Sequence, residues 1–331
     1  MAGPDPAVAA ARLAVRRSLT DLPPQPVLVA CSGGADSLAL LAATVFESRG
    51  CPWTVVGVTV DHALQDGSAE RARSVAAQMA ELGADETVTI RVSVEAPGMG
   101  PEAAARQARY AALSEAAERL GAERVLLGHT RDDQAETVLL GLTRGSGGRS
   151  IAGMRRRYTE GRTWFERPLL DLTRHETERA CRAQGITWWE DPHNDDPRFT
   201  RSRLRRRVLP VLEEELGPGV SAALARTADL LQQDLAALEE LADDAFEQLR
   251  TDDGGLDTAR LETQPPAIVT RVLRLAALAA GAAPADLSKG HVGALVELMQ
   301  RRHASGPAAQ VQLPGSVTAY LDRWTMRFRP T

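Results

Sequence analysis

The chain has few cysteines, and their arrangement excludes several kinds of site. Cys31, Cys51 and Cys181 are its only three, and no two of them form a Cys-x-x-Cys pair. An odd number of cysteines without such a pair argues against a disulfide framework and against a zinc or iron–sulfur centre. We therefore expect each of the three to be a small buried side chain.

Long hydrophobic runs are also absent. The amino-terminal segment lacks the apolar core of a signal peptide, and no apolar stretch is long enough to span a bilayer. The sequence therefore predicts a cytoplasmic protein without membrane contacts.

Lysine is nearly missing, since Lys289 is the only one among 39 basic residues. The net charge of −5 argues weakly against a nucleic-acid partner. Residues 144–207, however, hold sixteen arginines and nine acidic residues, a net of +7, which leaves −12 for the rest of the chain. This segment indicates either a basic face for phosphates or simply a preference for arginine over lysine.

The most informative stretch joins a predicted strand to a predicted helix near the amino end. Residues 27–31 are small and apolar, as in a buried parallel strand, and residues 38–43 open an apolar helix. Between them lies Ser32-Gly33-Gly34-Ala35-Asp36-Ser37, which we expect to form a tight turn. Its two glycines favour positive φ angles and a close approach of a ligand. The alternative is an ordinary strand-to-helix turn capped by Ser37.

This turn has the chemistry of an anion site. Exposed backbone N–H groups ahead of a helix attract anions, and the hydroxyls of Ser32 and Ser37 add donors. Asp36 is the unusual member, because a carboxylate repels a phosphate unless a cation lies between the two. The turn therefore predicts a magnesium-bound polyphosphate, with Asp36 on the metal.

Strand and helix patterns alternate through the first half of the chain. The predicted strands are 27–31, 54–60, 86–92 and 124–128, and the predicted helices are about 37–49, 68–83, 101–120 and 132–143. The sequence also predicts helices at 5–19 and 173–184 and a short strand at 164–168 that ends in proline. Such βαβ units predict an α/β fold with a doubly wound, mostly parallel sheet. Ligands of these sheets lie beyond the carboxyl ends of the strands.

Several polar residues fall at those ends. Asp61 and His62 follow the second strand and could face a nucleotide, although a lone histidine there is more often structural. We expect Ser68 to cap the next helix. On helix 101–120, Arg106 and Arg109 share a face, which is either solvated or a phosphate clamp, and Tyr110 is expected to pack on the sheet.

Residues 128–137 give the second strong signal. His129, Asp133 and Glu136 are spaced by four and three, so they share a stripe if the segment is helical. Acids at a helix start suit the helix dipole, which is the structural explanation. So many acids beside a phosphate loop nevertheless need cations, and magnesium and a substrate ammonium are the candidates. His129 could donate to a phosphate or transfer a proton.

The remaining segments indicate a basic helix and a second domain. Five arginines between 201 and 207 open a helix before Pro210, which favours contacts with RNA phosphates. Gly217-Pro218-Gly219 marks the predicted boundary between domains 1–216 and 217–331. The second domain is predicted to hold helices at 220–250, 265–280 and 288–301, the last of them capped by Ser288. A hairpin is predicted over 308–321, with a third strand at 324–328.

The turn at 32–37 resembles the PP-loop of ATP pyrophosphatases, which attach AMP to an oxygen atom and release pyrophosphate. Together with residues 128–137, it makes the chain similar to the tRNA(Ile)-lysidine synthetase family. Further matches lie at 60–62, 105–110, 144–154, 167–174, 191–194 and 199–205, so the resemblance spans roughly residues 27–213. Ser202 departs from the family pattern, which usually has asparagine there.

The resemblance implies a reaction in two steps. The C2 oxygen of the cytidine at the first anticodon position of a minor isoleucine tRNA attacks the α-phosphorus of ATP, and pyrophosphate leaves. The ε-amine of free lysine then displaces AMP and forms lysidine. ATP is thus the expected co-substrate, Mg²⁺ the expected cofactor, and a tRNA-holding role is implied for residues 217–331.

The resemblance also implies roles for individual residues. ATP and pyrophosphate would contact Ser32, Gly33, Gly34, Ala35, Ser37, Asp61 and His62. The catalytic residues would be Asp36, with its Mg²⁺, His129, Asp133 and Glu136. Asp133 and Glu136 would also bind the lysine ammonium. Phosphate or RNA contacts would come from Arg106, Arg109, Arg201 and Arg205.

Two other functions stay open at this stage. A PP-loop tRNA thiolase generally uses paired cysteines, which this sequence lacks. A non-catalytic module that binds RNA and senses ATP would have no need of Asp36 or of the acidic helix start. The sequence leaves the oligomeric state open, with a homodimer as one option.

Overall fold

The computed structural model describes residues 3–20, 22–51, 53–62, 67–93, 101–145, 147–191, 196–301 and 309–331. The chain divides into two compact units. The first comprises Met1–Gly145 and Ser150–Asp229, and the second comprises Ser146–Arg149 and Leu230–Thr331. The division falls inside the long helix α10 (Val220–Leu249), beyond the boundary predicted at residue 216.

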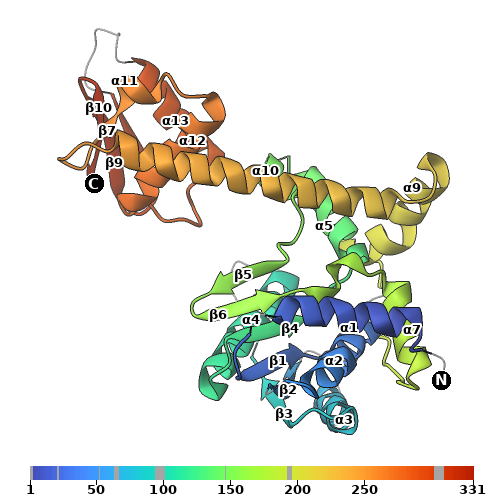
Figure 1. Cartoon of the computed structure of the whole chain (residues 1–331). Helices are drawn as coiled ribbons and strands as arrows, with labels where there is room; N and C mark the ends of the chain where they lie inside the picture. The colour runs from blue at the N-terminus through green and yellow to red at the C-terminus, as the bar shows by residue number, and fades with distance from the viewer. Residues whose placement is uncertain are drawn as a thin grey trace. The chain divides into compact units, whose positions relative to one another are not determined.

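The first unit is built on a six-stranded sheet in the order β3-β2-β1-β4-β6-β5, which can be followed in Figure 1. The strands are β1 (Pro26–Ala30), β2 (Thr54–Asp61), β3 (Glu86–Arg91), β4 (Arg124–Leu127), β5 (Arg157–Glu160) and β6 (Thr163–Glu166). All neighbours pair in parallel except β5 and β6, which form an antiparallel hairpin at the edge. The predicted doubly wound, mostly parallel fold is confirmed, and β5 is the strand that the sequence pattern missed.

Helices connect the parallel strands as predicted. They are α2 (Ala35–Ser48), α3 (Ser68–Glu81), α4 (Pro101–Leu120) and α5 (Arg131–Arg144), and a further helix, α1 (Pro6–Leu19), precedes β1. Side chains of β1 alternate between two cores: Val27 and Val29 pack with α1, α2 and α3, whereas Leu28 packs with α4. The sheet is therefore covered on both faces, and Tyr110 of α4 lies in the second core as expected.

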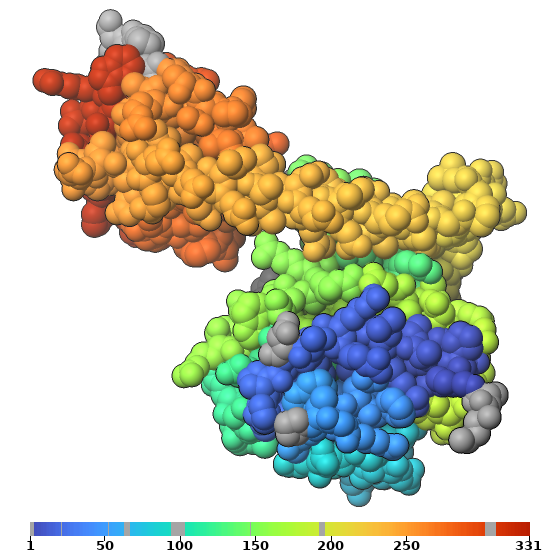
Figure 2. Space-filling view, in the orientation of Figure 1, coloured from blue at the N-terminus to red at the C-terminus, as the bar shows by residue number. Residues whose placement is uncertain are grey.

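The rest of the first unit is mainly helical. After the short helix α6 (Gly148–Ile151) and the sheet hairpin come the 3₁₀ turn η1 (Pro168–Asp171) and helix α7 (Arg174–Ala183). The arginine run forms α8 (Thr200–Arg203) and a π-helical turn η3 (Leu204–Val208), and α9 (Leu209–Leu216) follows with Pro210 in its first turn. In the space-filling view, α1 lies beside α7 and keeps its outer face exposed (Figure 2).

The second unit combines the remainder of α10 with α11 (Thr258–Leu261), α12 (Pro266–Ala279) and α13 (Lys289–Gln300). Its antiparallel sheet has the order β7-β10-β9-β8, formed by β7 (Leu256–Asp257), β8 (Gln310–Leu313), β9 (Val317–Asp322) and β10 (Thr325–Pro330). The predicted helices, hairpin and third strand are confirmed, as is the cap, because Ser288 accepts a bond from the backbone N–H of His291. No described helix is both long and apolar enough to cross a membrane.

Two smaller expectations are wrong. Cys31 and Cys181 are buried, but Cys51 is exposed in the loop after α2. Ser68 is the first residue of α3 rather than its cap, because Gly67 occupies the cap position with a φ of 77°. That left-handed conformation suits glycine and moves the helix start by one residue.

Candidate active site

The first unit contains a cleft of about 1930 Å³ at the carboxyl ends of its parallel strands. The chain runs from β1 to β2 and β3 on one side and returns to β4 on the other, so the direction of strand order changes between β1 and β4. Ligands of open α/β sheets bind at such a switch point. The two strong sequence signals follow β1 and β4, and the fold therefore brings them together.

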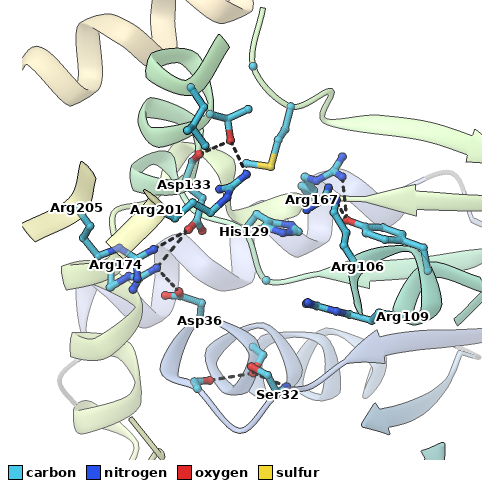
Figure 3. A pocket seen from close by; sticks show the side chains of 18 of the residues that line it. Ser32, Asp36, Arg106, Arg109, His129, Asp133, Arg167, Arg174, Arg201 and Arg205 are labelled. Atoms are coloured by element: carbon cyan, nitrogen blue, oxygen red, sulfur yellow. Dashed lines mark hydrogen bonds and ion pairs between the residues drawn. The ribbon is translucent and has the colours of Figure 1, made fainter. Parts of the chain in front are cut away.

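Figure 3 shows part of the lining of this cleft. The lining residues predicted from the sequence are Ser32, Gly34, Ala35, Asp36, Ser37, Arg106, Arg109, His129, Asp133, Arg201 and Arg205. Four predicted residues are not part of the lining, namely Gly33, Asp61, His62 and Glu136. Asp61 and Glu136 are buried, at 6% and 0% exposure.

The turn after β1 is shorter than expected, because α2 already begins at Ala35. Gly33 has a φ of 83°, and a Cβ there would lie 2.7 Å from Cγ2 of Val75. Gly34 has a φ of −80°, so only one of the two glycines adopts the positive φ predicted for both. Gly34 is the N-cap and makes no side-chain cap bond, which leaves the first N–H groups of α2 available to an anion.

Ser37 ties this turn together rather than capping the helix. Its Oγ accepts a bond from the backbone N–H of Ser32 at 3.2 Å and donates to the carbonyl of Gly34 at 2.9 Å. The capping role considered for Ser37 is therefore wrong, since the side chain stabilises the turn from within the first helical turn.

Gly128 allows residues 128–137 to pack against the turn at 32–37. A Cβ at this position would lie 2.9 Å from both the Cα and the N atom of Ser37. Real side chains essentially never approach backbone so closely, so only glycine permits this contact between the end of β4 and the start of α2. His129, the next residue, is thereby held beside the turn.

The segment after β4 becomes helical only at Arg131. Thr130 is the N-cap, and its backbone N–H donates to Oδ2 of Asp133 at 2.9 Å in a capping box. His129 precedes the helix, so it does not share a helical stripe with Asp133 and Glu136. Oδ2 of Asp133 thus stabilises the helix start, in line with the structural explanation, whereas Oδ1 faces two arginines.

That second oxygen belongs to a chain of alternating charges, which we call the acid–arginine chain. Its members, in order, are Asp36, Arg174, Asp133, Arg205, Glu136 and Arg201. Nη2 of Arg174 lies 3.4 Å from Asp36 and 3.3 Å from Asp133. Nη2 of Arg205 lies 3.3 Å from Oδ1 of Asp133, and its Nε lies 2.6 Å from Oε1 of Glu136. Nη1 of Arg201 lies 3.8 Å from the other oxygen of Glu136.

Burial and pairing set the charge state of these carboxylates. Burial raises the pKa of Asp36 to about 6, against the opposing effect of Arg174. Burial also raises the pKa of Glu136, and Arg205 opposes it. Burial resists ionisation of Asp133 as well, but Arg174 and the N–H of Thr130 leave its pKa below the ordinary value.

Arg174 and Thr177 of α7 were not predicted as site residues. Thr177 is fully buried, and its hydroxyl donates to Oδ1 of Asp36. Arg174 lies in a motif that was matched to the family, but no local pattern indicates that its guanidinium reaches two acids from distant segments. These contacts follow from the packing of α7 against α2, which brings together residues about 140 positions apart.

The opposite side of the cleft, which we call the cationic side, carries a cluster of arginines. It holds Arg106, Arg109, Arg167 and Tyr110, with His129 between this side and the acid–arginine chain (Figure 3). Burial and the three arginines lower the pKa of His129 to about 3, although Asp133 opposes the shift. His129 is therefore neutral, and its buried Nδ1 has no hydrogen-bond partner. Burial, and to a smaller extent the charge of Arg109, also lowers the pKa of His62.

Asp36 fits a metal ion only in partnership with a ligand. The described residues contain no group of three histidine, cysteine or acidic side chains that could hold a metal by themselves. Asp36 is 18% exposed at its side chain, lines the cleft and has a raised pKa, so its buried charge is incompletely compensated. One carboxylate plus substrate phosphates is a common environment of Mg²⁺.

Residues 192–194 of the family match, like Ser146, lie outside the described residues.

The sequence matches two family models in succession along the chain. One is described as the PP-loop domain and covers residues 9–212. The other is described as the TilS substrate binding domain and covers residues 256–324.

Curated relatives named tRNA(Ile)-lysidine synthase match over nearly their whole length. The one from Thermobifida fusca is 52% identical over 317 residues, which are 96% of this chain and 95% of the relative. The one from Streptomyces coelicolor is 48% identical over 344 residues, with 96% of each chain covered. Among solved structures, the U34-tRNA thiolase NcsA from Methanococcus maripaludis has a TM-score of 0.57 at 16% identity, covering 68% of this chain and 80% of its own. That likeness concerns the fold alone.

These matches confirm the family that the motifs predicted and extend it through the second unit. The protein belongs to the tRNA(Ile)-lysidine synthase family.

Proposed function

We propose that this protein ligates free lysine to C2 of the cytidine at the first anticodon position of a minor isoleucine tRNA, with ATP consumed to AMP and pyrophosphate. One observation carries the proposal above the others. An uncapped helix start suited to phosphates and an acidic segment suited to an ammonium line the same cleft, held together by the contact of Gly128 with Ser37. Family membership agrees with this reading.

The first step transfers an adenylyl group. The C2 oxygen of the cytidine bonds to the α-phosphorus of ATP while the bond to the β-phosphate oxygen breaks, and pyrophosphate leaves. The N–H groups at the start of α2 and the hydroxyls of Ser32 and Ser37 are placed to hold that anion. Asp36, together with phosphate oxygens, would hold Mg²⁺, which when bound supplies charge compensation for the leaving group.

In the second step the ε-amine of lysine bonds to C2 while the C2–O bond to the adenylyl group breaks, so AMP leaves with that oxygen. We assign Asp133 and Glu136 to recognition of the lysine ammonium, since carboxylates form strong charge-assisted bonds with it. Asp133 lines the cleft, whereas Glu136 lies behind it and is bonded to Arg205. Glu136 would therefore act on the substrate only after Arg205 or Arg201 moves toward an anion.

The attacking amine must lose a proton, and His129 is our candidate for the acceptor. Its imidazole is neutral with an unpartnered Nδ1, so it can take a proton. The surrounding arginines weaken it as a base in the ligand-free protein. A bound phosphate would compensate those arginines and raise the pKa of His129 toward its ordinary range.

The remaining assignments concern RNA. Arg106 and Arg109 are assigned to phosphate contacts on the cationic side, and Arg201 and Arg205 to phosphate or RNA contacts from the arginine-rich helix. We also propose that residues 1–216 carry the chemistry and that residues 217–331 hold the tRNA.

Pyrophosphate release tests the proposal when the substrates are supplied in turn. ATP alone should give no release, ATP with the tRNA at most one equivalent per enzyme–tRNA complex, and sustained turnover should require lysine as well. Sustained release without tRNA or without lysine would contradict it. A sulfur-containing product would favour the thiolase alternative.

A further inference from the structure

Arg167 occupies an unusual position for a charged residue. It follows β6 directly, at the same edge of the sheet as the turn after β1, and is only 3% exposed. Nη1 donates to the carbonyl of Arg155 at 2.6 Å, and Nη2 donates to the hydroxyl of Tyr110 at 3.4 Å. Its Nε is buried without a hydrogen-bond partner. All of these contacts are to neutral groups.

The neighbouring arginines also lack a carboxylate partner, although both are exposed to solvent. Nη2 of Arg106 donates to the same hydroxyl of Tyr110 at 3.1 Å, and Arg109 lines the cleft beside it. Within the described part of the chain, no carboxylate lies at ion-pair distance from Arg106, Arg109 or Arg167. Asp36 and Asp133 of the cleft lining are instead engaged by Arg174 and Arg205.

A buried guanidinium without a counter-ion costs several kcal/mol, and proteins rarely retain one unless a ligand supplies the charge. The neutral state of His129 agrees with a strongly positive field on this side of the cleft. Two guanidinium groups bonded to one phenol hydroxyl, with Arg109 beside them in the cleft lining, offer many donors and no acceptor charge, which matches the oxygens of a phosphoryl group.

We propose that Arg167, with Arg106 and Arg109, forms a second phosphoryl-binding site in this cleft, separate from the turn at 32–37. The inference rests on the proposed function, because ATP and RNA are the substrates that would bring such a group. The ligand is a phosphate of one of two sources, either the α-phosphoryl group of the nucleotide or a backbone phosphate of the RNA beside the target base. Arg167 is the buried anchor of the site, and Tyr110 aligns it with Arg106.

Arg167→Met tests the site, with Arg162→Met as the matched control. Arg162 lies in the turn of the same β5–β6 hairpin and is exposed. Its substitution therefore removes the same charge without changing the lining of the cleft. Two affinities are measured separately on the full chain: ATP without tRNA, and tRNA without ATP at several salt concentrations. Loss of one charge-assisted contact should weaken one of the two by roughly tenfold or more.

The two arms identify the source of the phosphate. Weaker ATP binding with unchanged tRNA binding assigns the nucleotide. Weaker tRNA binding assigns the RNA backbone, and the slope of log K against log salt concentration should then be shallower by about one. Affinities of Arg167→Met that both stay within about twofold of the wild type, as expected for Arg162→Met, would overturn the proposal.

Two further variants keep the test decisive. Arg167→Lys retains the charge and should recover part of the lost affinity. If Arg167→Met does not fold, Arg106→Met carries the test, because the side chain of Arg106 is exposed and its hydrogen bond is to Tyr110. These readouts are binding constants, so they stay valid even if the wild type forms no lysidine, a result that would refute the proposed function alone.

Discussion

The carboxylates of Asp36 and Asp133 share one guanidinium, that of Arg174, at 3.4 and 3.3 Å. Asp36 lies in the first turn of α2, which follows β1, and Asp133 lies in the first turn of α5, which follows β4, so Arg174 links the two segments that the proposed reaction needs side by side. Its position makes Arg174 a positioning residue for both acids.

Arg174→Met should slow tRNA-dependent pyrophosphate release by about tenfold or more at neutral pH, because two buried carboxylates lose their common cation. The pKa of Asp36 should rise further, which moves the acidic limb of the pH–rate profile to higher pH. The initial rate measured from pH 5.5 to 8.5 checks both effects. Arg174→Lys should restore part of the rate.

Arg179→Met is the matched control on the same helix, since Arg179 is 52% exposed and pairs with Asp5 outside the cleft. It should leave both the rate and the pH profile unchanged. An Arg174→Met profile that falls in rate without moving along the pH axis would count against the shared-cation role.

Gly128→Ala should disrupt the contact on which the site depends. The added Cβ would meet the backbone of Ser37 at 2.9 Å, and backbone cannot yield as a flexible side chain does. We expect the free energy of unfolding to fall by about 1–3 kcal/mol and the KM for ATP to rise. Urea denaturation and steady-state kinetics measure the two effects. Gly50→Ala, where a Cβ meets nothing within 4 Å, is the control, and equal effects of both variants would exclude a special role for Gly128.

Asp36→Asn should stabilise the protein at neutral pH while abolishing activity. The pKa of Asp36 is raised from 3.8 to about 6 on folding, so the folded protein binds this proton more tightly than the unfolded chain. Raising the pH through that window therefore costs stability, and the neutral amide avoids roughly 1–3 kcal/mol of this cost at pH 7.5. The stability gap between variant and wild type, followed by denaturation from pH 4 to 8, should open as the pH rises. A gap that is constant with pH would show that Asp36 ionises normally.

Asp133→Asn should raise the lysine concentration needed for half-maximal turnover by tenfold or more, with a smaller effect on the KM for ATP. Asp132→Asn is the control at the same helix start, because Asp132 accepts the backbone N–H of Arg174 and is not part of the cleft lining. Substrate-saturation curves for lysine and ATP give the comparison. A lysine KM unaffected by Asp133→Asn would remove this residue from the lysine site.

The elements of the fold could be predicted because their signals are local. Apolar runs, helix periods and glycine-proline breaks placed β1 to β4 and the long helices of both units within about two residues, but not the one-turn helices α6 and α11. The strand β5 escaped prediction because Arg157–Glu160 is polar and lies at the edge, where only its pairing with β6 fixes it. Residue type alone also does not determine φ, as the different conformations of Gly33 and Gly34 illustrate.

The candidate site could be predicted only in outline. The order of the strands brings residues 32–37 and 128–133 together, and that placement follows from the βαβ pattern. Which arginine pairs with which acid does not, because the partners in the acid–arginine chain come from α2, α5, α7 and the region of α8 and η3. The buried position of Arg167 and the role of Gly128 likewise depend on packing between distant segments.

The mass of the nucleosides in the tRNA tests the central claim most directly. After incubation with ATP and lysine, digestion and mass spectrometry should show one cytidine per minor isoleucine tRNA converted to a nucleoside heavier by one lysine less one water. The product should be missing when ATP or lysine is omitted, or when a transcript carries uridine at that position. An unmodified cytidine under complete conditions, with folded wild-type protein, would contradict the account.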